Sequence, residues 1–370
     1  MGACMTKPGY QNNVVERDRR RLSASKADAV AGKPASDGRS NLVTRGEGNI
    51  LDLFPGASRK SSICGVASDA HQKGFADKKT DAVEGDGLST LRVGCVCKKG
   101  LKPESPNQDD FCVFRVEQVN TATGIYGVFD GHGPYGHDIS NFVQEALPRC
   151  FVRDADFKAD PEKALSSAFL EAHRLCTESQ TDANFDCTLS GTTATLAMHR
   201  DGILYVAHVG DSRAVLARSR GSELKSENLT VDHKPTCDAE RKRIQAKGGQ
   251  VRRLEGDIPH RVFVSGKLYP GLTMTRSIGD TVGTTAGVTS TPDVKVLKVQ
   301  KDWRFMLVCS DGIWEFIDSQ EAVNLISRYP PWDVQKATEN LASEAWNRWI
   351  KEEGNVVDDI TVICAYFNED

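Results

Sequence analysis

The sequence predicts an α+β fold in which an antiparallel β-sandwich is covered by helices. Residues 190–219 alternate between polar and apolar side chains and contain an Asp-Gly turn, which is typical of a hairpin or meander. The other strand-like runs are interrupted by long helical segments, and strands and helices do not alternate regularly as they do in a parallel sheet. We therefore expect antiparallel strands with the helices on the outside.

Size and composition narrow the class of protein. The chain has 370 residues, a net charge of -4 and 26% charged residues, which suits one large soluble domain or two ordinary ones. It contains no run of about 18 apolar residues and no secretory signal, so we expect a cytosolic protein without a membrane-spanning helix. Most of the eleven cysteines, such as Cys112 and Cys309, lie in apolar segments and are expected to be free core thiols.

The first residues match the M-G-x-x-x-[ST] pattern for myristoylation of Gly2. One myristoyl chain holds a protein only weakly on a membrane, so a second signal is needed. Cys4 offers a site for palmitoylation, and an arginine cluster at residues 17–21 could bind an anionic leaflet. We expect a tether to the cytoplasmic face of a membrane, the plasma membrane first. The alternative is a solvated charged tail on a cytoplasmic protein.

Two regions of different composition divide the chain. Residues 1–87 are poor in aromatic and β-branched side chains and hold 14 Lys and Arg against 11 Asp and Glu, whereas the remainder holds 33 against 40. We expect residues 1–87 to be a largely disordered basic tail with one short helix at residues 49–54. Residues 88–370 are expected to form the folded catalytic domain.

The expected elements of this domain follow from their periodicity. An apolar strand at residues 125–129 stops at Asp130-Gly131-His132-Gly133, and another at residues 305–309 stops at Ser310-Asp311-Gly312. The remaining elements are a strand that runs into a turn at 91–100, strands at 111–116 and 356–367, and helices at 137–147, 161–179, 237–247, 319–327 and 333–353.

Five acids lie at strand ends that are far apart in the sequence. Any one of them is more often a turn or capping residue, but five without a matching set of buried cations suggest a metal site. Carboxylates without Cys ligands suit Mg²⁺ or Mn²⁺, and two such ions can activate a water for attack on a phosphoryl group. His132 is placed to protonate the leaving oxygen. The five acids are Asp109, Asp130, Asp211, Asp311 and Asp358.

Three other readings fit less well. Gly131-x-Gly133-x-x-Gly136 matches a dinucleotide fingerprint, but Asp130 would repel a pyrophosphate and no acid ends a second strand about 20 residues later. Cys237 and Arg243 have the spacing of a cysteine phosphatase, but the residues between them form a helix and not a phosphate loop. No kinase motif set is present.

The motifs together resemble those of the protein phosphatase 2C family of metal-dependent Ser/Thr phosphatases. They occur in the family's order over residues 88–370: NQDDF, VFDGHG, SGTTA, VGDSR, DHKP, RSIGD, CSDGIWE and DDIT. The resemblance implies a four-layer α/β/β/α sandwich with two Mg²⁺ or Mn²⁺ ions between two antiparallel sheets. It also implies phosphoprotein substrates. We expect a monomer with no nucleic-acid partner.

The resemblance also assigns roles to individual residues. Asp130 would bridge the two ions and Gly131 would offer its backbone oxygen, with His132 as general acid. Asp311 and Asp358 would complete one ion's shell, Asp109 would act through water or from behind the ligands, and Asp211 would hold a third ion with Asp311. Asp359 stands where the family usually has Asn, which leaves the division of work between Asp358 and Asp359 open; we favour Asp358 as the ligand.

The phosphate-binding position departs from the family. Counted back from NQDD, the family's arginine falls on Glu104, which cannot hold a phosphate. If the loop carries a two-residue insertion, Lys102 takes this place, although Lys is a point charge and lacks arginine's bidentate fork. A merely solvated Lys102 is the alternative. The family's variable flap would span residues 260–291.

The sequence therefore predicts a membrane-tethered phosphatase that cleaves phosphoserine and phosphothreonine with a metal-activated water. A pseudophosphatase of the same fold, acting as a binding module, is the alternative that the Glu104 substitution favours. A generic dinuclear phosphodiesterase is a third reading.

Overall fold

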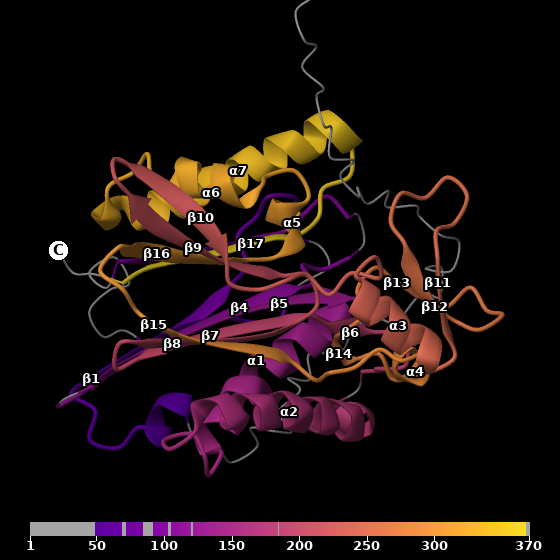
Figure 1. Cartoon of the computed structure of the whole chain (residues 1–370), viewed down its shortest axis with the longest axis horizontal. Coiled ribbons are helices and arrows are strands. Elements are labelled where there is room, and N and C mark those ends of the chain that lie inside the picture. Colours follow the sequence, from indigo (N-terminus) through magenta and orange to yellow (C-terminus); the bar gives the residue numbers. More distant parts are fainter. Residues whose placement is uncertain are drawn as a thin grey trace, which may run out of the picture.

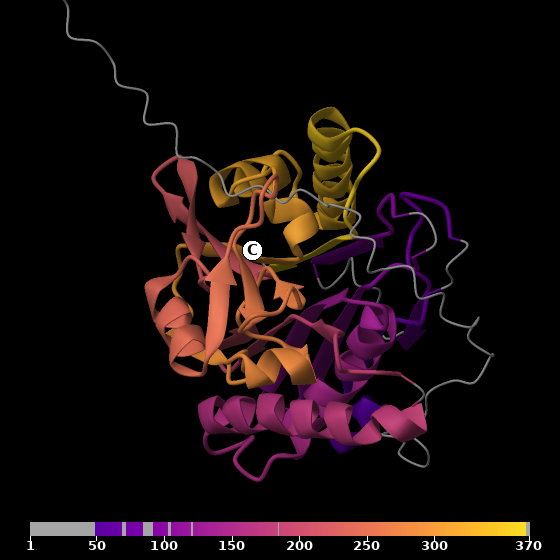
Figure 2. The same cartoon turned by 90° about the vertical axis from the view of Figure 1, so that its right-hand side faces the viewer.

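Two large antiparallel sheets stack face to face, with helices on both outer faces (Figures 1 and 2). The structure is a computed structural model that describes residues 49–68, 72–83, 92–102, 105–119, 121–183 and 185–367. Its four layers confirm the predicted α+β sandwich. None of the helices in these ranges combines the length and apolarity needed to cross a bilayer.

The first sheet carries its strands in the order β15-β8-β7-β5-β4-β1-β2, with the short strands β6 and β14 attached beside β5. The helices α1 (Gly136–Arg153) and α2 (Pro161–Ala183) cover its outer face, with the 3-10 helix η1 (Ile50–Leu53) beside them. The strands are β1 (Arg59–Gly65), β2 (Thr80–Val83), β4 (Asp109–Gln118), β5 (Thr121–His132), β6 (Gly191–Thr192), β7 (Ala194–Arg200), β8 (Ile203–Val209), β14 (Ile278–Gly279) and β15 (Asp293–Lys298).

The second sheet has the order β10-β9-β16-β17-β3. Its outer face is covered by α6 and α7, and α5 lies at the end of β16 (Figure 1). The strands are β3 (Val93–Lys98), β9 (Arg213–Arg220), β10 (Glu223–Asn228), β16 (Trp303–Cys309) and β17 (Ile360–Tyr366). The helices are α5 (Asp311–Trp314), α6 (Ser319–Ile326), η2 (Pro331–Asp333) and α7 (Val334–Glu353).

Both faces of the central strands are buried, which is why they read as continuous apolar runs. On β4, Phe111 and Val113 pack between the two sheets, while Cys112 and Phe114 pack beneath the helices. On β16, Met306 and Val308 point into the same inter-sheet core, and the alternating Phe305, Leu307 and Cys309 pack on the side of α6 and α7. Because successive side chains of a strand point to opposite faces, the two sheets form three hydrophobic layers, one between the sheets and one under the helices on each outer face.

A smaller unit lies at one end of the sandwich, on the right in Figure 1. It consists of a three-stranded sheet, β11 (Gly249–Arg252), β12 (Arg261–Val264) and β13 (Pro270–Leu272), with α3 (Asp238–Ala246) and α4 (Thr281–Thr285). The flap expected at residues 260–291 therefore starts earlier, at β11. Its RSIGD end belongs instead to the first sheet, because β14 pairs with β6.

The expected boundary at residue 88 is too late for the fold. β1 pairs with β4 along six residues, and β2 pairs with β1, so the first sheet uses chain from residue 59 onward. Lys78 is fully buried against Asp110, with 3.4 Å between the ammonium nitrogen and the carboxylate oxygen. The short helix expected at residues 49–54 is confirmed as η1. Gly2 and Cys4 lie outside the described residues, and their acylation remains a prediction.

Candidate metal centre

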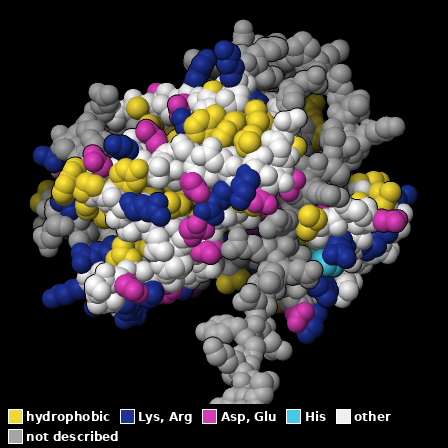
Figure 3. Space-filling model, turned by 90° about the horizontal axis from the view of Figure 1, so that it is seen from above, with side chains coloured by type: hydrophobic (Ala, Val, Ile, Leu, Met, Phe, Trp, Pro, Cys, Tyr) yellow, Lys and Arg dark blue, Asp and Glu magenta, His cyan; other side chains and the backbone are white. Residues whose placement is uncertain are grey.

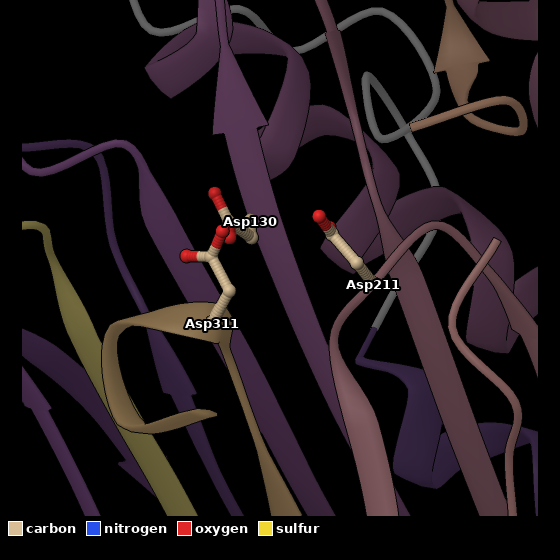
Figure 4. Close-up of side chains that lie close together, drawn as sticks. All are labelled: Asp130, Asp211 and Asp311. Atoms are coloured by element: carbon tan, nitrogen blue, oxygen red, sulfur yellow. The ribbon is translucent and has the colours of Figure 1, made fainter. Parts of the chain in front are cut away.

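Three of the five predicted acids meet at one point between the sheets. Asp130, Asp211 and Asp311 each offer a carboxylate oxygen, and these atoms all lie within 4.8 Å of one another. The three side chains point toward a common space from three separate elements (Figure 4). No other group of three such side chains is found in the described part of the chain.

The topology brings these acids together. Asp130 lies near the end of β5 in the first sheet, where its amide donates to the Thr193 hydroxyl at 3.0 Å. Asp211 lies between β8 and β9, where the chain passes from the first sheet to the second. Asp311 follows β16 of the second sheet and opens α5. The cluster therefore spans both sheets.

The donor set fits a hard divalent cation. Three carboxylates this close repel one another, and a cation between them relieves the repulsion. Their oxygens are the ligands that Mg²⁺ and Mn²⁺ prefer. Lys234 pairs with Asp211 and supplies one positive charge at the edge of the cluster. Lys234 belongs to the DHKP motif, and the sequence alone assigned no role to this lysine.

Asp109 does not belong to the cluster, although β4 and β5 place it directly opposite Asp130. Its carboxylate accepts hydrogen bonds from the hydroxyls of Ser310 at 2.7 Å and Thr361 at 2.6 Å. Burial raises the pKa of Asp109 well above its ordinary value, and the Asp359 carboxylate adds to the rise. Because Ser310 directly precedes Asp311, this hydrogen bond lets Asp109 hold Asp311 in position without itself being part of the cluster.

The two acids before β17 have different partners. The Asp359 carboxylate accepts from the backbone amides of Gly100 at 2.7 Å and Gln108 at 2.8 Å, one on each oxygen. Asp359 thus joins two loops, one with each carboxylate oxygen. An Asn side chain has a single oxygen and could take the place of only one of them. Asp358 instead pairs with the ammonium group of Lys102. Asp358 lies outside the three-carboxylate cluster.

Lys102 is therefore not simply solvated. Burial opposes its charge, but the carboxylates of Asp358 and Asp359 outweigh burial and raise the pKa of Lys102. The neighbouring Lys99 fixes the loop, because its ammonium group donates to the carbonyls of Lys102 at 3.1 Å and Ser105 at 2.6 Å. Glu104 lies outside the described residues, so the structure does not test its departure from the family pattern.

Gly131 needs its lack of a side chain. A Cβ atom there would lie 2.2 Å from the Gly136 carbonyl oxygen and 2.7 Å from that of Gln108, both of them backbone atoms. The backbone amide of Gly131 donates to Gln108 at 3.1 Å. The glycine therefore lets β5 run directly beside the start of α1.

His132 ends β5 and contacts an acid that sequence reasoning did not single out. Its Nε2 lies 2.7 Å from Oδ2 of Asp280, the last residue of RSIGD. Asp280 is fully buried, and Ser277 donates a hydrogen bond to the same oxygen. The sequence feature that could have identified Asp280 is its position as the final acid of RSIGD, a motif to which no role had been assigned.

Comparisons with known proteins show which family the chain resembles. A family model for protein phosphatase 2C matches residues 104–353. The chain is 36% identical over 290 residues to probable protein phosphatase 2C 35 of Arabidopsis thaliana, a match that covers 72% of this chain and 81% of the relative. It is 30% identical over 354 residues to probable protein phosphatase 2C 34 of the same plant, over 87% of this chain and 98% of the relative.

Among solved structures, the serine-threonine phosphatase 2C from Toxoplasma gondii superposes with a TM-score of 0.65. The match covers 75% of this chain and 94% of that chain at 20% identity. At this level of identity the likeness is one of fold.

Proposed function

The chain belongs to the protein phosphatase 2C family, and we propose that it hydrolyses phosphoserine and phosphothreonine at the cluster of Asp130, Asp211 and Asp311. Membership makes it a metal-dependent protein serine/threonine phosphatase. The observation that carries the assignment of the site is the meeting of three carboxylates from both sheets within 4.8 Å.

Asp130 and Asp311 would hold two Mg²⁺ or Mn²⁺ ions. The Gly131 carbonyl and Asp358 would complete the ligand set of these ions, and Asp211 with Asp311 would hold a third ion. Bound ions supply the acidity that makes water a nucleophile and the positive charge that a phosphoryl group requires. Asp109 keeps Asp311 in place through its hydrogen bond with Ser310, the preceding residue.

The leaving group determines what His132 does. Cleavage breaks the bond between phosphorus and the serine or threonine oxygen, and that oxygen needs a proton as it departs. His132 ends the strand that carries Asp130, two residues after that acid, and its side chain is 20% exposed. His132 gives the proton to the oxygen, and the products are a free hydroxyl and inorganic phosphate.

The test is Mn²⁺- or Mg²⁺-dependent release of phosphate from a phosphothreonine peptide. We expect Asp130→Ala to lower kcat by at least about a thousandfold, because the metal charge on the transferring phosphoryl group is worth several kcal/mol. Without substrate, Mn²⁺ should raise the melting temperature of the wild type, since a ligand that binds only the folded state stabilises it. Asp130→Ala should lose most of this shift.

Asp238→Ala is the matched control, because Asp238 is exposed at the start of α3. It should keep both the activity and the Mn²⁺ shift. A wild-type protein that releases no phosphate with either metal, or an active Asp130→Ala variant, would contradict the assignment.

We further propose that Gly2 and Cys4 carry acyl chains that tether the enzyme to the cytoplasmic face of a membrane. The support is the sequence pattern together with the basic residues at 17–21, which provide the second signal that a single acyl chain needs. Partition of the full chain between membrane and soluble fractions tests this.

A further inference from the structure

We propose that Asp280 is a positioning residue that holds the ring of His132 in the orientation in which it gives a proton to the leaving oxygen. The inference rests on the proposed function and adds a residue to it. Asp280 ends RSIGD, the motif that the metal cluster leaves unexplained.

The pair has the geometry of a fixed hydrogen bond. The distance between His132 Nε2 and Asp280 Oδ2 is 2.7 Å, and the Asp280 side chain is completely buried while that of His132 is 20% exposed. The Ser277 hydroxyl donates to the same Oδ2 and keeps it from turning. Nε2 is therefore anchored inside the protein, which leaves Nδ1 as the nitrogen that gives the proton. Nδ1 is itself buried, although 20% of the His132 side chain is exposed.

The backbone around the pair is built to place this carboxylate. β6 bridges β5 and β14, with His132 opposite Gly191 and Gly191 opposite Gly279. The Asp280 amide donates to the Ser190 carbonyl at 2.9 Å. Asp280 itself is left-handed, with φ 49°, which is uncommon for a residue other than glycine.

Gly191 provides the space for the carboxylate. A Cβ atom on Gly191 would lie 2.3 Å from Asp280 Oδ2, closer than side-chain contacts allow. The glycine of SGTTA and the acid of RSIGD thus fit together around one oxygen atom. This mutual fit is hard to explain if the carboxylate has no defined partner.

The chemistry requires such an anchor. A proton donor acts efficiently only when its ring is already aligned with the departing oxygen, and a buried carboxylate on the other side of the imidazole provides that alignment. Asp280 reaches the reaction only through His132. It is not placed to contact substrate.

Two substrates with different leaving groups isolate this role. A phosphothreonine peptide releases an alkoxide that needs a proton, whereas p-nitrophenyl phosphate releases a stable phenolate that needs little help. For Asp280→Asn we expect kcat on the peptide to fall about 10- to 100-fold, within the range of general acid catalysis. The fall on p-nitrophenyl phosphate should be several times smaller, so the ratio of the two kcat values drops.

Asn suits this test because it is nearly isosteric with Asp and tolerates the left-handed conformation. Asp201→Asn is the matched control, since Asp201 is also left-handed, with φ 53°, and lies in the exposed turn between β7 and β8. It should keep the wild-type ratio. In a His132→Ala background, Asp280→Asn should cause no further loss on the peptide, because both changes remove the same function.

Two results would overturn the proposal: an unchanged ratio of the two kcat values in Asp280→Asn, or a full additional loss in the His132→Ala background. An equal loss on both substrates would mean that Asp280 serves the metal centre or the fold in general. Failure of the proposed function appears differently, as a wild-type protein that cleaves neither substrate with Mn²⁺.

Discussion

Lys102 lies in a loop that packs closely against the segment before β17. A Cβ atom on Gly100, two residues before Lys102, would lie 2.2 Å from the Val357 carbonyl oxygen. Its ammonium group pairs with Asp358, and Asp130 contributes to raising the pKa of Lys102. A charged amine held there can neutralise Asp358 and also bind one phosphate oxygen of the substrate.

Inorganic phosphate, the product, reports this second role without catalysis. We expect Lys102→Met to raise the inhibition constant of phosphate about tenfold or more, because a charge-assisted hydrogen bond is worth about 1.5–3 kcal/mol. Lys102→Arg should keep or improve phosphate binding through its bidentate fork. The exposed Lys158→Met is the control. An unchanged constant in Lys102→Met would restrict Lys102 to neutralising Asp358.

At the scale of elements, α3 braces the segment that leads to RSIGD. The buried Glu240 of α3 accepts hydrogen bonds from Arg243 on its own helix, from the Thr275 hydroxyl and from Arg276. Arg276 also binds Asp293 at the start of β15, at 2.7 Å. Burial acts to raise the pKa of Glu240, but the two guanidinium groups outweigh it and hold the pKa well below its ordinary value.

This depressed pKa predicts a pH dependence of stability. The ionised Glu240 stabilises the fold fully above about pH 4.5, the value of an unperturbed Glu, and this contribution is lost as the pH falls further. Glu240→Gln should therefore lower the free energy of unfolding at pH 7 by about 2 kcal/mol. The difference from wild type should shrink by up to about 1.4 kcal/mol per pH unit below that point.

Urea denaturation at pH 7 and pH 3.5, both with a chelator, measures this difference. Glu162→Gln, an exposed change in the first turn of α2, is the control and should behave as wild type at both values. A difference between Glu240→Gln and wild type that is the same at both pH values would mean that the brace is steric and not ionic.

At the scale of the whole molecule, the proposed catalytic site and the proposed membrane tether lie in different parts of the chain. The face seen in Figure 3 mixes Lys and Arg with Asp and Glu, and residues 88–370 as a whole are acidic. The basic residues at 17–21 precede the described fold. We therefore propose that these residues, and not the sandwich, would be attracted to an anionic leaflet.

The tether predicts a stepwise loss of membrane binding in cells. Gly2→Ala should move the protein almost entirely to the soluble fraction, because it removes the first acyl chain, and Cys4→Ser should leave an intermediate amount bound by myristate alone. Phosphatase activity of the purified variants should not change. If both variants remain as membrane-bound as wild type, acylation does not anchor this protein.

The sequence by itself determined the layers and most of the acids. Apolar runs on β4, β5, β16 and β17 predicted buried strands because both of their faces are covered, and helical periodicity placed α2, α6 and α7 within a few residues of their ends. Asp130, Asp211 and Asp311 were recognisable because a carboxylate at the end of a buried strand needs a compensating charge.

Only the tertiary structure decided which groups meet. Strand β1 is half polar, so its composition resembled a disordered tail, and its place in the sheet depends on pairing with β4, about fifty residues further along the chain. Lys78 with Asp110, Lys102 with Asp358, and Asp280 with His132 are likewise contacts between distant segments. Local sequence carries periodicity and turn preferences, but a hydrogen bond or ion pair between such segments exists only once the chain has folded and brought them side by side.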